Sequence, residues 1–242
     1  MAEDRDPLLR ELESEVRREQ LAKLWDRYGI YVVGLAAAIV LGVGGYQWWQ
    51  ARTLAAAQEA GARYQAAIQL AQQGKTEESR QALEAIVRDG PAGYATLARL
   101  QLAGEAASAG KKDEALTIYE AIAGNSGADL LLRQYAELQI ASLKVDTADF
   151  TEIQNRLTPL TGDNNAWRHS ARELLGLSAY RAGRLEEAKQ IFRELAADQQ
   201  TPPSIRERAG IIMGLITSAE AQQAAQSGQA GGAPSAETPK VQ

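Results

Sequence analysis

Three glycines at regular intervals mark a repeated pattern in the larger part of the chain. Each of Gly74, Gly110 and Gly183 is followed by a small residue five positions on and by a large residue four positions further. A small residue lets two helices approach closely, and a residue four positions further lies on the same helix face. The pattern therefore predicts a helical hairpin at each glycine. The small residues are Ser79, Ala115 and Ala188, and the large ones are Leu83, Tyr119 and Phe192.

The intervals between the glycines predict the architecture. Gly74 and Gly110 are 36 residues apart, and Gly110 and Gly183 are 73 apart, which is about two units. We therefore expect a degenerate unit between them, with helices at 130–143 and 150–157 and with residues 145–149 in place of a glycine turn. A period near 34 to 37 residues built from two helices is typical of tetratricopeptide repeats.

About four hairpins and a capping helix are expected, because one hairpin alone cannot bury its apolar face and stacked hairpins can. We expect Pro202 and Pro203 to end the last hairpin. Ser204 should cap a final helix running to about Ala219. The other predicted hairpins pair 62–72 with 77–88 and 94–109 with 112–123, and the apolar residues sealing the stack would be Ile211, Ile212, Leu215 and Ile216.

An uncharged segment precedes the repeats. Residues 28–51 carry no charge, and the 19 residues from Tyr28 to Tyr46 also lack amide side chains. At about 1.5 Å per residue these 19 span about 28 Å, the thickness of a hydrocarbon core. Aromatic residues lie toward both ends, where a helix meets the membrane interface. The pattern predicts a transmembrane helix at 28–51.

Basic residues indicate the orientation of this helix. Five Arg or Lys residues lie within 20 positions before it, whereas only Arg52 and Arg63 lie within 20 after it. Residues 1–27 should therefore be cytoplasmic, partly as an amphipathic helix, and residues 52–220 should lie across the membrane. A cleaved signal peptide is the alternative, supported by Ala55-Ala56-Ala57, but the acidic leader and the long apolar run do not fit one. Residues 221–242, rich in Gln, Ala, Gly, Ser and Pro, are expected to form a disordered tail.

Composition favours an all-α fold. Ala, Leu, Glu, Gln and Arg are abundant, against two Phe and seven Pro, and unbranched side chains lose little freedom in a helix. The net charge of -5 includes no basic cluster in the large segment, which argues against nucleic acid as a partner. The absence of cysteine excludes disulfides, thiolate metal sites and a cysteine nucleophile.

No catalytic, cofactor-binding or metal-binding residue is predicted, so the chain is expected not to be an enzyme and to have no small-molecule substrate. The single histidine, His169, stands at the start of a predicted helix and is expected to be a surface or capping residue. Asp163-Asn164-Asn165 is expected to be a loop and cap rather than a calcium site. Acidic pairs should favour the helix dipole at the start of second helices, and they are Glu77-Glu78, Asp113-Glu114 and Glu186-Glu187.

The order of these features resembles the YfgM-like family, the ancillary subunit of the bacterial SecYEG translocon, in which a single anchor precedes a tetratricopeptide-like periplasmic domain. The resemblance covers about residues 11–217. It rests on the segments VLGVGGYQWW at 40–49, ARYQAA at 62–67 and YATLARLQLA at 94–103. In this chain Arg172 and Ala179 stand where the repeat usually has Trp and Tyr, so no groove residue is carried over from the repeat.

The resemblance implies a single-pass protein of the bacterial inner membrane with a cytoplasmic N-terminus and a periplasmic domain. The implied partners are SecYEG, a PpiD-like periplasmic chaperone and newly translocated polypeptides. Our leading hypothesis is accordingly a non-enzymatic binding subunit that links the translocon to periplasmic chaperones. The alternative is a membrane-anchored repeat scaffold for envelope assembly or cell-division coordination.

Overall fold

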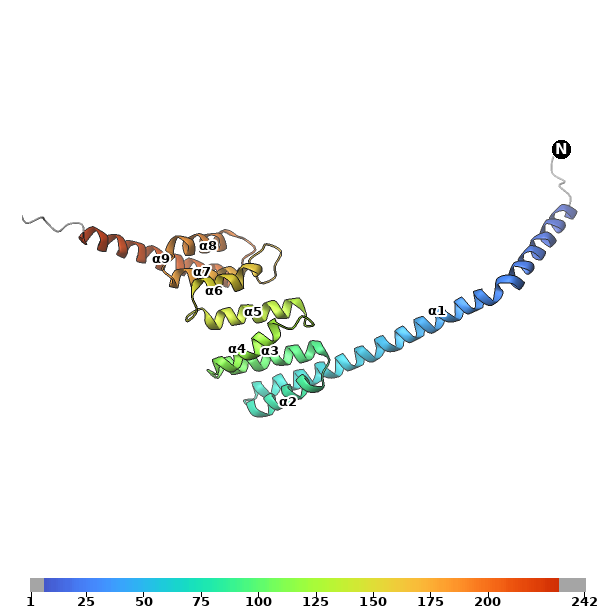
Figure 1. Ribbon diagram of the computed structural model, residues 1–242, viewed down its shortest axis with the longest axis horizontal. Coiled ribbons are helices and arrows are strands. Elements are labelled where there is room, and N and C mark those ends of the chain that lie inside the picture. The colour runs from blue at the N-terminus through green and yellow to red at the C-terminus, as the bar shows by residue number, and fades with distance from the viewer. Residues whose placement is uncertain (1–6, 231–242) are drawn as a thin grey trace, which may run out of the picture. The chain divides into compact units, whose positions relative to one another are not determined.

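The computed structural model describes residues 7–230, and every regular element in that range is a helix (Figure 1). Side chains are described from residue 25 to residue 222, apart from Val32 and Ala36. The all-α prediction is thus confirmed. The elements are α1 (Pro7–Gln72), α2 (Thr76–Asp89), α3 (Ala92–Ser108), α4 (Lys112–Ala123), α5 (Leu130–Lys144), α6 (Phe150–Leu157), the short 3-10 helix η1 (Thr158–Leu160), α7 (Arg168–Arg181), α8 (Leu185–Ala197) and α9 (Pro203–Ala230).

Contacts divide the chain into two units, residues 1–59 and residues 60–242. Helix α1 crosses this boundary, and its residues from Ala60 onward belong to the second unit. The helices predicted at 28–51 and 62–72 both lie in this one helix. Residues 52–60 consist mainly of Ala with Leu, Gln and Glu and contain no Pro or Gly, so nothing in the local sequence stops the helix.

The first unit carries the apolar segment. The described residues contain one helix that is long and apolar enough to cross a membrane, from Trp25 to Gln72, and only 6% of its most apolar window is buried. Side chains such as Ile30, Leu41 and Val40 are exposed to more than two-thirds of their full extent. A core helix of a soluble protein would bury such residues against its neighbours.

The three predicted glycine turns are confirmed. Gly74, Gly110 and Gly183 have φ values of 77°, 76° and 73°, a left-handed conformation that other residues adopt only with strain. In each turn the residue after the glycine donates its backbone N–H to the carbonyl five residues earlier, at 2.9 Å. This hydrogen bond is characteristic of a Schellman ending. The same local chemistry thus closes the first helix of three hairpins.

The small and large positions of the repeat are buried as predicted. Ser79, Ala115 and Ala188 have no exposed surface. Ser79 also donates its hydroxyl to the carbonyl of Ala67 at 2.8 Å, which satisfies a polar group inside the first hairpin. The large residues four positions further, Leu83, Tyr119 and Phe192, are at most 3% exposed.

The degenerate unit has the predicted helices, α5 and α6, without a glycine turn. Asp149 precedes α6 and accepts a hydrogen bond from the backbone N–H of Glu152 at 2.8 Å. A side-chain cap therefore starts the second helix of this hairpin. The second helices of the other three hairpins start without such a cap.

The core of the second unit is divided into clusters in chain order. Each helix from α2 onward packs on its neighbours in sequence (Figure 1), and the buried residues form four clusters. The first joins Ala67, Leu83 and Ile86 to α3, and the last joins Phe192 and Leu195 to α9. Burial is therefore shared between adjacent hairpins, as in repeat proteins.

The C-terminal helix differs from the prediction. Helix α8 ends at Ala197, five residues before Pro202, and Pro203 begins α9. Proline is favoured in a first helical turn, where its missing N–H has no partner to lose. Ser204 is therefore inside the first turn and is not the cap. Helix α9 also continues to Ala230, so residues 221–230 are helical where we expected a disordered tail, and residues 231–242 lie outside the described range.

Candidate protein-binding surfaces

The second and third hairpins share a register of buried positions, with an offset of 35 residues between their first helices and of 38 between their second helices. Ala115, Tyr119 and Ile122 of α4 are buried, and so are Ile153, Leu157 and Leu160 at the same separation further along the chain. Likewise, Ala103 and Ala106 of α3 correspond in burial to Leu138 and Ala141 of α5. Residues at matching positions in the two hairpins can therefore be compared directly.

Two clefts lie at matching places in these hairpins. One is formed between α2, α3 and α4, and has a volume of about 440 Å³. The other is formed between α4, α5, α6 and η1, with a volume of about 560 Å³. Each cleft thus combines the second helix of one hairpin with both helices of the next. We call the first the apolar groove and the second the polar cleft.

Half-buried apolar side chains form the floor of the apolar groove. They are Val87 from α2, Leu102 from α3 and Ile118 from α4. Exposed Thr117 and Ala121 lie along the same stretch of α4. Concave sites with solvent-exposed apolar surface commonly bind a partner or ligand.

Charge on the rim of the apolar groove is unbalanced. Its one carboxylate, Glu84, lies 3.3 Å from the guanidinium of Arg80. Its two other charged residues, Arg88 and Arg99, form no ion pair with any residue whose side chain is described. This end of the groove is therefore locally positive.

The groove continues toward the glycine turns, where the carboxylates of Glu84, Glu105 and Glu114 outnumber the basic side chains of Arg80 and Lys111. A second hollow shares Glu84, Leu102 and Ile118 with it and reaches Arg80 and Lys111. Arg80 lies 2.7 Å from Glu77, and Lys111 lies 3.5 Å from Glu114. The uncompensated positive charge is thus confined to the Arg88 and Arg99 end.

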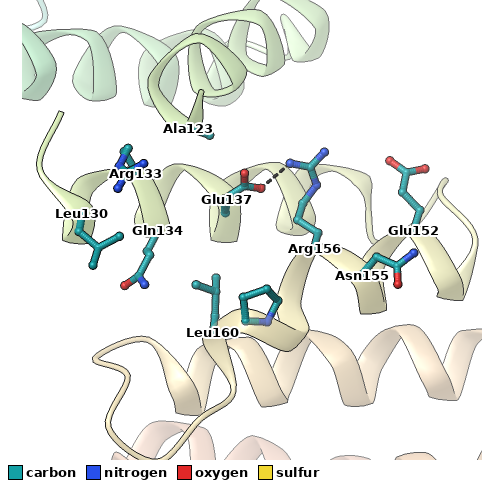
Figure 2. A pocket seen from close by; sticks show the side chains of 10 residues that line it. Ala123, Leu130, Arg133, Gln134, Glu137, Glu152, Asn155, Arg156 and Leu160 are labelled. Carbon is teal, nitrogen blue, oxygen red and sulfur yellow. Dashed lines mark hydrogen bonds and ion pairs between the residues drawn. The ribbon is translucent and has the colours of Figure 1, made fainter. Parts of the chain in front are cut away.

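The polar cleft contains an ion pair where the apolar groove has hydrocarbon. By the shared register, Leu102 corresponds to Glu137 and Ile118 corresponds to Arg156. Figure 2 shows Glu137 on α5 and Arg156 on α6 pointing toward each other, and they form an ion pair. The same position between helices is therefore apolar in one hairpin and ionic in the next.

Arg133 lies at the end of the polar cleft away from Glu152 (Figure 2). Its Nε atom is buried and has no hydrogen-bond partner. Glu152, which also lines this cleft, is engaged by the Lys144 ammonium at 2.9 Å. The polar cleft therefore offers a partner mixed polar and apolar surface, whereas the apolar groove offers mostly apolar surface.

His169 is buried, which corrects the prediction of a surface or capping residue. It lies in the first turn of α7 with only 8% of its surface exposed. Its Nδ1 is 3.1 Å from the Thr201 hydroxyl and 3.7 Å from an Asp198 carboxylate oxygen. Burial lowers the pKa of the imidazole below its ordinary value, Arg168 adds to the effect, and Asp198 opposes it. His169 thus connects α7 to the loop that follows α8.

The acidic pairs lie where we predicted them. All three occupy the first turn of a second helix, in α2, α4 and α8. Basic residues at the turns lie close to them: Lys75 is 3.8 Å from Glu78, and Arg184 is 2.6 Å from Glu187. Their position supports a role in stabilising helix ends.

Asp163 and Asn165 hold a loop, as predicted, but the N-cap residue of the following helix α7 is Trp167, so the predicted cap is not found. Asn165 accepts a hydrogen bond from the backbone N–H of Trp167 at 2.8 Å, and Asp163 accepts one from Arg172 at 2.7 Å. Arg172 also donates to the carbonyl of Thr161 at 3.0 Å. The arginine at a customary aromatic position therefore secures this loop. Among the described residues, no group of three His, Asp or Glu side chains is placed to hold a metal ion.

The groove residues were not predicted, although the sequence contains a signal for them. Once the hairpins are aligned on their buried positions, Leu102 and Ile118 are matched by Glu137 and Arg156. An apolar pair at a position that holds an ion pair in the next hairpin marks a place where stacked hairpins accept either chemistry. The alignment needs the buried positions of the degenerate hairpin, which its sequence alone does not reveal.

Comparison with protein families matches residues 22–210 to a tetratricopeptide repeat-like domain. No curated protein shows significant similarity to the chain. No solved structure does either.

Proposed function

Because this chain belongs to the family of tetratricopeptide repeat-like domains, we propose that it is a non-enzymatic, membrane-anchored subunit that binds other proteins. The observation that carries the proposal is the open apolar groove between α2, α3 and α4. In the proposed architecture, four hairpins form an α-solenoid and α9 closes its end. Arginine, glutamate, amide and apolar side chains make up most of the lining of the two clefts, which favours binding over catalysis.

The proposed anchor is the apolar part of α1, at residues 28–51. It would cross the bacterial inner membrane once, with residues 1–27 in the cytoplasm and residues 52–220 in the periplasm. The excess of basic residues before the segment supports this orientation. The exposure of its apolar side chains supports lipid as their environment.

The proposed partners are the SecYEG translocon and a PpiD-like periplasmic chaperone, with newly translocated polypeptides as clients. The resemblance to the YfgM-like family supports this choice. A binding domain held beside the channel by its own anchor would meet polypeptides as they emerge. Its effective concentration there would far exceed that of a free protein.

Affinity purification of the tagged full chain in mild detergent tests the proposed partners. We expect SecYEG subunits in the purified complex, and we expect crosslinks from the second unit to reach a periplasmic chaperone. An intact complex without any translocon component would contradict this assignment. Crosslinks mainly to peptidoglycan synthases or outer-membrane assembly factors would instead support the alternative, a scaffold for envelope assembly or cell division.

Protease added to spheroplasts tests the proposed topology. Residues 52–220 should be digested, whereas an epitope at the N-terminus should be degraded only after the membrane is opened. N-terminal sequencing provides the control for processing. A mature chain starting near Gln58 would show that the apolar segment is a cleaved signal peptide.

A further inference from the structure

We propose that the apolar groove binds a short segment of a partner protein in which apolar side chains are flanked by carboxylates. The inference rests on the proposed protein-binding function and specifies the chemistry of the bound segment. It concerns the groove between α2, α3 and α4, with Val87, Leu102 and Ile118 as its floor.

Hydrocarbon is not the only chemistry that this position between stacked hairpins accepts. At the matching place in the next hairpin, Glu137 and Arg156 form an ion pair (Figure 2). The neighbouring positions in that hairpin, such as Ile153 and Leu157, are nevertheless buried and apolar. Hairpins of this chain therefore stack with either chemistry at this position. Half-buried Leu102 and Ile118 leave apolar surface in water, and covering that surface with apolar side chains is favourable.

The rim selects the charge of the segment. Arg88 and Arg99 form no ion pair with a described side chain, and the one carboxylate of the rim, Glu84, shares the Arg80 guanidinium with Glu77. The second unit as a whole is acidic between residues 52 and 220, with 22 Asp and Glu against 19 Lys and Arg. The positive end attracts carboxylates, whereas the acidic surface elsewhere repels them, so an acidic segment is directed to this end of the groove. Guanidinium groups also form paired hydrogen bonds with carboxylates.

Fluorescence anisotropy with the full chain in detergent micelles tests the proposal. The probe is a labelled synthetic peptide with a leucine-rich centre and glutamates at both ends. Two matched peptides carry lysines in place of the glutamates or serines in place of the leucines. We expect the glutamate–leucine peptide to bind most tightly, and we expect added salt to weaken its binding.

Substitution of both rim arginines is the decisive variant. Arg88→Gln together with Arg99→Gln should weaken binding of the glutamate–leucine peptide about tenfold, because two partly exposed ion pairs are lost. Arg193→Gln, on an exposed position of α8, is the matched control and should leave the dissociation constant unchanged. Thermal unfolding checks that all variants are folded.

A second variant tests the groove without changing the arginines. Thr117→Glu places a carboxylate at an exposed position on the groove lining, so it should weaken binding of the acidic peptide while leaving the fold intact. Equal binding of the glutamate and lysine peptides would overturn the proposal. A dissociation constant within twofold of wild type in the double arginine variant would also overturn it.

Occupation of the groove by a second copy is a separate outcome. The chain has no cysteine, so Ala121→Cys introduces a single reactive thiol beside the groove. A short bis-maleimide should not join two copies through this thiol. Efficient crosslinking into dimers that excludes the peptide would show that the groove is an interface between copies, which contradicts the proposal.

The two proposals can fail independently. If SecYEG still co-purifies with the double arginine variant and the peptide binds as in wild type, the groove assignment is wrong and the proposed function stands. If no protein co-purifies with the wild type but peptide binding depends on Arg88 and Arg99, the groove assignment stands and the proposed function fails.

Discussion

Helices α7 and α8 approach so closely that Gly176 has no room for a side chain. A Cβ at Gly176 would lie 2.9 Å from the Phe192 ring and 3.2 Å from Ile191 Cγ2. Phe192 has no exposed surface, so its ring cannot turn away without disturbing the core. Close approach here depends on the absence of a single methyl group.

Gly176→Ala should therefore destabilise the second unit. Overpacking costs about 1–3 kcal/mol, and the gain in helix propensity returns about 1 kcal/mol, which leaves a net loss of about 1 kcal/mol. Gly214→Ala is the control, because a Cβ there meets nothing within 4 Å; it should be neutral or stabilising. Thermal unfolding followed by circular dichroism measures both. An unchanged melting temperature for Gly176→Ala would contradict the close approach.

His169 predicts how stability depends on pH. Burial holds its pKa below the ordinary value, with help from Arg168 and Arg172 and against the effect of Asp198. The folded state therefore disfavours the protonated imidazole. This stabilising contribution is fully present above the unfolded pKa, about 6.5, and is lost as the pH falls toward the lowered folded pKa.

The melting temperature of the full chain should decrease as the pH is lowered through this window. His169→Gln removes the titrating group but keeps a polar side chain near Thr201, so its melting temperature should change less over the same range. Parallel melting curves at several pH values provide the measurement. The same pH dependence in both proteins would exclude His169 as the cause.

At the scale of the element, α9 packs through one face only. Ile205, Ala209 and Ile216 are buried against α8, whereas Ile211 and Leu215 are 59% and 48% exposed. Two further contacts fix the helix: Lys189 of α8 lies 2.7 Å from Glu220, and Glu173 of α7 lies 2.6 Å from Arg208. The prediction that four apolar residues seal the stack is therefore wrong for Ile211 and Leu215.

Substitution of two isoleucines of α9 separates its buried face from its exposed face. Ile216→Ala should destabilise the chain by about 2–5 kcal/mol, because it leaves a cavity against α8. Ile211→Ala should change stability by no more than about 0.5 kcal/mol. Chemical denaturation of both variants checks the difference. Similar losses at the two sites would contradict the packing of α9.

At the scale of the whole molecule, the contacts separate residues 1–59 from residues 60–242. The part of α1 after Ala60 packs in the first core cluster through Ala67. The repeat unit therefore contains its complete core without the apolar segment. We infer that it folds without residues 1–51.

A fragment that starts at Arg52 should be soluble without detergent and should unfold cooperatively. Size-exclusion chromatography and circular dichroism provide the measurements. A second fragment starting at Lys75 lacks the first helix of the first hairpin and is the control. It should be less stable, because Leu83 and Ile86 lose the surface that buries them. Aggregation of the Arg52 fragment would contradict the division into units.

Most of the hairpins could be predicted because their signals are local. The bounds of α4 and α6 agree with the prediction, those of α2 differ by one residue at each end, and those of α5 differ by one residue at the C-terminal end. Glycine turns and the capping Asp149 act within a few residues of themselves, so they can be recognised in the sequence alone. The continuity of α1 was not predicted, because its parts were assigned separately by their polarity, whereas residues 52–60 contain no Pro or Gly that would end a helix.

The sequence by itself determined that the chain is helical, where its hairpins turn and which segment is apolar enough for a membrane, because each of these depends on residues close together in the chain. Only the tertiary structure decided that His169 meets Thr201 and that Val87, Leu102 and Ile118 line one groove. Those relations join residues from different helices. They depend on how the helices pack, and packing is not encoded in any single segment.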